Sequence, residues 1–143
     1  MTRDLLDLSS LRKAVASLER ALNFAQVRLA NNNISLDEKE VIQAGVIQNF
    51  EFTYELCWKF MKRWLELNLM PGLLDGATRK ELFRHAVEQK LISDFSIWVK
   101  YHELRNTTSH TYNREVADEI YGMSKVFLED ALYLLKSLEV RND

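Results

Sequence analysis

The stretch Asp37–Leu69, DEKEVIQAGVIQNFEFTYELCWKFMKRWLELNL, decides the fold of this chain. Apolar side chains recur in it every three or four positions, which is the spacing of an amphipathic helix. Asp37, followed three residues later by Glu40, is a candidate N-cap. A helix of about 30 residues is about 45 Å long at 1.5 Å per residue. We therefore expect one long helix to organise the molecule.

This predicted helix is apolar on two sides. One stripe consists of Ile42, Val46, Thr53, Cys57, Phe60, Trp64 and Leu67, and the other of Ile47, Phe50, Tyr54, Trp58, Met61 and Leu65. A helix that is apolar on two sides is buried on two sides. One stripe can face the chain's own core, while the other meets either a later helix of the same chain or a second subunit. The pattern therefore leaves a homodimer open.

Four further helices are expected, spanning about 10–30, 78–90, 93–105 and 113–141, with the main loop at 70–76. The first follows apolar spacings of three and four from Leu8 to Leu29. Ser9 or Ser10 can cap its start, and the run Asn31–Asn33 can stop it, because asparagine tolerates the left-handed conformation that ends helices. Thr78 with Glu81, Ser93 with Asp94, and Asn113 are the caps expected for the later helices.

Glycine and proline are scarce, at four and one in 143 residues. Strand-rich folds and doubly wound α/β folds need more of both in their turns, so both classes are excluded. We expect an all-α fold, an antiparallel up-and-down bundle of four to five helices forming a single domain over residues 1–143. The net charge of −2 leaves the kind of partner open, because a local patch can still bind a phosphate backbone.

Cysteine and hydropathy patterns bear on the compartment. The single cysteine, Cys57, cannot form an internal disulfide, and no Cys/His pair has the spacing of zinc ligands. We therefore expect no metal and no cofactor, and a cytoplasmic location. No run of 18 apolar residues exists, so no membrane partner is expected.

One short stretch, Arg105–Asn113 (RNTTSHTYN), contains no aliphatic residue in a chain whose composition is 47% hydrophobic. Capping explains part of it, since Asn106 can close one helix and Asn113 can open the next. Capping does not explain why arginine, histidine and tyrosine share one connection. These side chains bind phosphate, move protons near neutral pH and present a nucleophilic phenol.

The spacing of Arg105, His110 and Tyr112 resembles the R-x4-H-x-Y signature of HEPN domains, specifically the HepT-like branch. The segment Gln48–Lys59 (QNFEFTYELCWK) is similar to the F-E-[FY]-x-[YF]-E-L-x-W-K segment of small nucleotidyltransferase substrate-binding proteins. Helix count and chain length match as well, so the resemblance covers essentially the whole chain. The resemblance implies a dimerising helical bundle that works beside a minimal nucleotidyltransferase and, in HepT-like members, cleaves RNA without a metal.

The resemblance also implies roles for individual residues. Arg105 and His110 are the expected catalytic pair, Tyr112 is the expected site of AMP transfer, and Asn106 and Ser109 are expected beside it for modification or substrate binding. Glu51 and Glu55, four residues apart on the long helix, are expected to support Arg105 or His110 or to form a solvated charged stripe. The alternative function is a non-catalytic subunit that binds the substrate or nucleotide of a two-component nucleotidyltransferase.

Overall fold

A computed structural model describes residues 5–142; residues 1–4 and 143, the ends of the expected domain, lie outside it. No strand occurs among the described residues, so the predicted all-α class is confirmed. The elements are α1 (Ser9–Leu29), α2 (Leu36–Asn68), α3 (Arg79–Glu88), α4 (Phe95–Asn106), a short 3₁₀ helix η1 (Thr108–His110) and α5 (Arg114–Val140).

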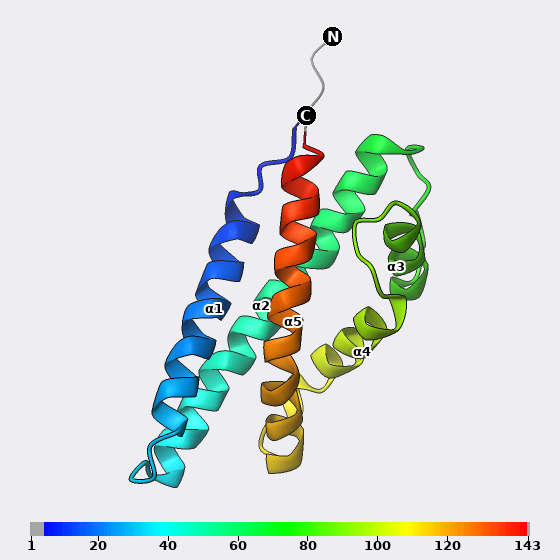
Figure 1. Ribbon diagram of the computed structural model, residues 1–143. Helices are drawn as coiled ribbons and strands as arrows, with labels where there is room; N and C mark the ends of the chain where they lie inside the picture. The colour runs from blue at the N-terminus through cyan, green and yellow to red at the C-terminus, as the bar shows by residue number, and fades with distance from the viewer. Residues whose placement is uncertain (1–4, 143) are drawn as a thin grey trace.

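The helices form an up-and-down bundle in which α1, α2 and α5 are the long members (Figure 1). α1 runs down the view, α2 returns upward, α4 leads back down and α5 rises again. The short helices α3 and α4 together take the place of one long helix, with α3 beside the upper part of α2 and α4 beside its middle. This arrangement brings the end of α4 to the start of α5 at the lower end of the bundle.

Both apolar stripes of α2 are covered by the chain's own helices. On one side the Thr53 hydroxyl donates to the Ala14 carbonyl of α1 at 3.3 Å. On the other side Phe50 meets Phe127 of α5, with ring centroids 4.9 Å apart. The alternative in which the second stripe meets another subunit is therefore wrong, because α3, α4 and α5 already bury it.

Three predicted caps are confirmed. The side chains of Thr78, Asp94 and Asn113 accept hydrogen bonds from backbone amides of the first turns of α3, α4 and α5. Each satisfies an amide that has no partner within its helix. The start of α5 is therefore fixed directly after the polar stretch.

Three other end signals were wrong. α2 is capped by Ser35 rather than Asp37, with its hydroxyl accepting from the Glu38 amide at 3.1 Å. α1 begins after Leu8 with no side-chain cap, so neither Ser9 nor Ser10 serves. The end of α1 was predicted correctly, since the helix stops at Leu29 just before Asn31–Asn33, but the reason was wrong: within residues 5–142, Lys90 is the only non-glycine residue with positive φ, so none of these asparagines is left-handed. A short polar side chain can close a turn in ways that spacing alone does not distinguish.

The two ends of the described chain lie together at the upper end of the bundle (Figure 1). The Leu6 amide donates to the Asn142 side-chain oxygen at 2.9 Å, and the Asn142 amide group donates to the Leu6 carbonyl at 2.8 Å. Over residues 5–142, no helix combines the length and apolarity needed to cross a membrane.

Candidate functional site

The junction between α4 and α5 carries the polar stretch identified in the sequence. α4 ends at Asn106, and the Thr107 hydroxyl then donates to the Leu104 carbonyl at 2.7 Å. η1 follows within one residue, and the cap of α5 closes the junction. The backbone of the connection is therefore built from hydrogen-bonded turns rather than from glycine or proline.

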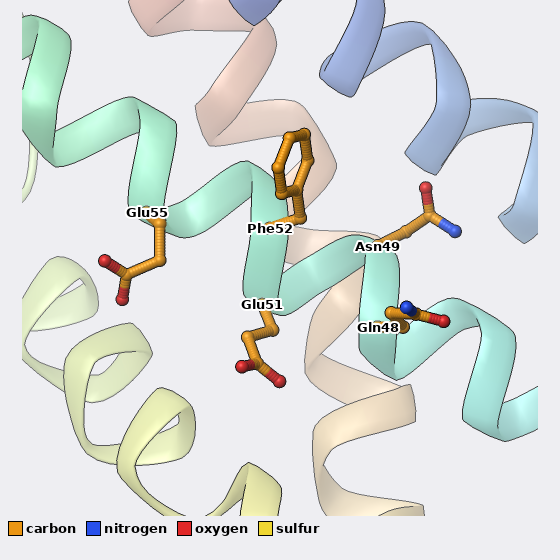
Figure 2. A pocket seen from close by; sticks show the side chains of 5 residues that line it. All are labelled: Gln48, Asn49, Glu51, Phe52 and Glu55. Carbon is orange, nitrogen blue, oxygen red and sulfur yellow. The ribbon is translucent and has the colours of Figure 1, made fainter.

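Arg105 is held on three sides. Its Nε donates to Glu55 Oε1 at 3.0 Å, and its second terminal nitrogen lies 3.3 Å from Glu51 Oε1. The other terminal nitrogen donates to the Thr108 hydroxyl at 3.3 Å. Figure 2 shows Glu51 and Glu55 projecting from α2 toward the same side, as residues four apart on a helix do. Both glutamates therefore contact Arg105, with the shorter contact from Glu55.

A second layer of contacts supports Glu55. Its other carboxylate oxygen accepts from Trp58 Nε1 at 3.0 Å, and the Arg79 guanidinium lies 3.4 Å from the centroid of the Trp58 ring. Next to this group, Tyr54 Oη and His102 Nδ1 are 2.8 Å apart. Burial lowers the pKa of His102, and the positive charges of Arg79 and Arg105 lower it further.

His110 and Tyr112 lie in solvent beyond Arg105. Their ring centroids are 6.0 Å apart at an interplanar angle of 76°, and Tyr112 is 87% exposed. Within residues 5–142, the His110 side chain makes no hydrogen bond to Arg105 or to the two glutamates. Asn106 and Ser109 are also exposed. The fold thus brings Arg105, Glu51 and Glu55 into one cluster and leaves His110 and Tyr112 free beside it.

Two surface hollows lie near these groups, one lined by Glu51 and Glu55 and the other by Tyr112. One of about 430 Å³ is lined by Gln48, Asn49, Glu51, Phe52 and Glu55 along α2 (Figure 2), and Phe52 is 61% exposed. The other, of about 300 Å³, lies between α2 and α5, and its lining includes Gln43, Tyr112 and Arg114. A fixed guanidinium, an exposed imidazole and open surface on both sides provide the groups needed to bind a phosphate and transfer a proton.

Sequence reasoning missed several members of the cluster. Thr108 falls inside the gap between Arg105 and His110, and its place three residues after Arg105 was the available signal. Tyr54 and Trp58 were interpreted as core residues, although a phenol and an indole N–H in a buried stripe need polar partners. No sequence signal tied Arg79 or His102 to them, because their contacts join helices that are distant in sequence.

The chain is similar in sequence to a known protein family. The family model described as nucleotidyltransferase substrate binding protein like matches residues 6–140. A Haemophilus influenzae protein named "Probable ribonuclease HepT" is 38% identical over 147 residues, covering 99% of this chain and 98% of that protein.

Two solved structures share the fold. One from Haemophilus influenzae, described as the substrate binding domain of a nucleotidyltransferase, has a TM-score of 0.88 at 35% identity, covering 93% of this chain and 99% of that one. A structure from Thermus thermophilus has a TM-score of 0.63 at 27% identity, covering 92% of this chain and 97% of that one. The chain therefore belongs to the nucleotidyltransferase substrate-binding protein-like family.

Proposed function

We propose that this protein is the HEPN component of a toxin-antitoxin type gene pair, a metal-independent endoribonuclease that acts on RNA in the cytoplasm. The observation that carries the proposal is the clamped Arg105, held by Glu51, Glu55 and Thr108, with the exposed His110 on the same short junction. The 38% identity to a protein named as a ribonuclease, over nearly the whole chain, supports the same activity.

The chemistry requires a proton acceptor, a proton donor and a cation. A neutral His110 accepts the proton of a ribose 2′-hydroxyl, whose oxygen then attacks the adjacent phosphorus. Arg105 stabilises the negative charge that develops on the phosphoryl oxygens. A protonated imidazole gives its proton to the departing 5′-oxygen as the P–O5′ bond breaks. The products are a 2′,3′-cyclic phosphate and a 5′-hydroxyl end.

One exposed histidine per chain supplies only one of the two proton-transfer groups, so we propose that a homodimer supplies the second. The surface of α2 that carries Gly45, Gln48 and Phe52 suits a second copy, because it is open and lies beside Glu51 and Arg105. Glycine inside a helix costs about 1 kcal/mol relative to alanine. Apart from its two chain neighbours and the backbone of its own helix, nothing within residues 5–142 lies within 4 Å of where a Gly45 Cβ would be, so packing inside the described chain does not require glycine there.

Tyr112 is the proposed point of control by a cognate minimal nucleotidyltransferase. Its exposed Oη attacks the α-phosphorus of ATP held by that enzyme, the bond to the β-phosphate breaks, and pyrophosphate leaves while the enzyme takes the phenolic proton. The 87% exposure of the side chain gives the access that this transfer needs. The new phosphate next to His110 repels an RNA phosphate and blocks cleavage.

A second candidate function is a non-catalytic subunit that binds the substrate or nucleotide for a two-component nucleotidyltransferase. It is favoured by the description of the family and by the absence, within residues 5–142, of a hydrogen bond between His110 and Arg105. Here Arg105, His110 and Tyr112, together with Asn106 and Ser109, serve as binding groups.

The deciding experiment compares wild type, His110→Ala and Ser10→Ala, each expressed with and without the cognate nucleotidyltransferase. Ser10→Ala is the control, because Ser10 is exposed at the start of α1 and caps nothing. Loss of growth and RNA fragmentation by wild type and Ser10→Ala, but not by His110→Ala, supports the ribonuclease. Purified protein should cleave in the presence of EDTA, and a single adenylyl group on Tyr112 after co-expression should abolish cleavage. Intact RNA with all three variants supports the binding subunit instead.

A further inference from the structure

A second arginine approaches the Arg105 cluster from the opposite side. Arg79 is the first residue of α3, and its guanidinium covers one face of Trp58 at 3.4 Å from the ring centroid. Trp58 in turn donates to Glu55, whose other oxygen accepts from Arg105. Burial lowers the pKa of His102, and the charges of Arg79 and Arg105 lower it further, so both arginines lie near enough to this imidazole to act on it.

The two arginines differ in how their charge is balanced. Arg105 has two carboxylates within 3.3 Å. Within residues 5–142, Arg79 forms no salt bridge, and its buried Nε has no hydrogen-bond partner. A desolvated cation without a counter-ion is costly, and the cation–π contact compensates only in part. Arg79 therefore has the Tyr54 hydroxyl and the Trp58 ring as neighbours but no carboxylate partner among the described residues, so its charge can attract an anion, whereas Arg105 is paired with two carboxylates.

The surface at Arg79 has the size and charge for one phosphate group. A hollow of about 230 Å³ is lined by Arg79, Trp58, Lys62 and Thr78 among other residues. Sites for whole small-molecule ligands run from roughly 300 Å³ upward, so this one suits a single phosphate rather than a nucleotide. Lys62 adds a second cation whose ion pair with Glu66 is long, at 3.9 Å. Glu55 and Glu66 are the nearby carboxylates, and each already has a partner.

We propose that Arg79 and Lys62 bind a backbone phosphate of the RNA strand, next to the phosphate that is cleaved at Arg105 and His110. This inference rests on the proposed ribonuclease function and extends it to how the strand is held. Arg79 contributes binding because its charge is free, while Arg105 contributes to the reaction because carboxylates fix its position. An arginine fork matches two phosphate oxygens, so one side chain makes two hydrogen bonds there.

Binding of a short fluorescein-labelled single-stranded RNA tests the site, using His110→Ala protein so that the strand stays intact. Arg79→Gln in this background should raise Kd about five- to tenfold. Measured from about 50 to 200 mM salt, the slope of log K against log salt concentration should become less steep by about one, because one phosphate contact is lost. Lys80→Gln is the matched control, since it removes the same charge one residue further along α3. It should change Kd less than about twofold.

Equal losses from Arg79→Gln and Lys80→Gln, or no loss from Arg79→Gln in a protein with the wild-type circular dichroism spectrum, would overturn the proposal. If Arg79→Gln does not fold, Lys62→Gln takes its place, with the same rise in Kd expected and an unchanged Kd counting against the site. In the cleavage assay with His110 intact, Arg79→Gln should raise KM and leave kcat close to wild type. A loss confined to kcat contradicts a strand-binding role.

RNA binding at Arg79 and RNA cleavage at His110 are measured separately, so each can fail without the other. A wild-type protein that cleaves no RNA removes the ribonuclease proposal, while Arg79-dependent RNA binding still upholds the phosphate site. Titration with ATP in the same assay distinguishes the source of the phosphate. Arg79-dependent binding of ATP without Arg79-dependent binding of RNA overturns the assignment to an RNA strand.

Discussion

Helix α4 contributes to two regions of opposite character within one turn of each other. Tyr101 is fully buried, packing edge-on to Trp98 and Phe127 and donating its hydroxyl to Asp130. Arg105, four residues later, has a side chain 30% exposed and is held only by polar contacts. Packing of rings stabilises the bundle, and the charged contacts of Arg105 lie at its edge, where we propose that RNA is cleaved. Changes on the two sides of this boundary should therefore separate stability from activity.

The largest effect is expected in the aromatic region. Phe127 is fully buried, and its ring packs against those of Phe50, Trp98 and Tyr101. Phe127→Ala should lower the free energy of unfolding by about 3–5 kcal/mol, because it removes apolar contacts and leaves a cavity. Urea titration measures this. Val126→Ala, on the exposed side of the same helix, should cost below about 1 kcal/mol, and similar losses from both would contradict the comparison.

The next effect lies in the polar region and concerns the two glutamates. Glu55→Gln weakens a charge-assisted hydrogen bond worth about 1–3 kcal/mol, so kcat/KM for RNA cleavage should fall between about 5- and 150-fold. Glu51→Gln should cost less, since its contact with Arg105 is longer and its side chain is 40% exposed. The free energy of unfolding of both variants should stay close to that of the wild type. A larger loss of cleavage from Glu51→Gln would reverse the assignment of the main support.

Gly45 offers a test of the proposed dimer surface on α2. Gly45→Ala should stabilise the isolated chain by up to about 1 kcal/mol and weaken self-association, because the added methyl group meets the second copy. Gly122→Ala is the matched control, since its Cβ also meets nothing within 4 Å. It should give the same stabilisation without changing association. Sedimentation equilibrium and thermal unfolding measure the two effects, and equal association by both variants would exclude this surface.

The smallest effect is a pH dependence from His102. Its pKa is lowered in the folded protein, mainly by burial, so the unfolded chain binds the proton more readily. Stability should therefore be unaffected well above pH 6.5 and decline as the pH falls through about 6.5. Because the side chain is half-buried, the slope stays below the ~1.4 kcal/mol per pH unit of one full proton. His102→Gln should flatten this part of the profile, and an unchanged profile would contradict it.

The contrast between the two regions also explains what could be predicted from the sequence. Periodic apolar residues located the helices to within a few residues, because burial of a stripe repeats along the chain. The capping of α3, α4 and α5 followed from short local patterns around Thr78, Asp94 and Asn113. The two contacts of Arg105 with α2 are 50 and 54 residues away in sequence, and no local pattern contains them.

Other contacts depended on geometry that one sequence does not carry. Which glutamate lies nearer Arg105 is set by the crossing of α2 and α4, and the stacking of Arg79 on Trp58 is set by how α3 returns after the loop. The second apolar stripe of α2 was ambiguous for a related reason. A buried stripe looks the same whether a helix of the same chain or of another chain covers it, and here α4 and α5 do so.

The two hydrogen bonds between Leu6 and Asn142 make the bundle a candidate for circular permutation. Because these two residues are hydrogen-bonded to each other, a short linker can join them without crossing the surface. New ends can be opened in the exposed loop around Pro71 and Gly72, where few contacts would be lost. Both the joined and the opened ends lie away from the α4–α5 junction in Figure 1. A reporter or a tethering group attached there would leave that junction free.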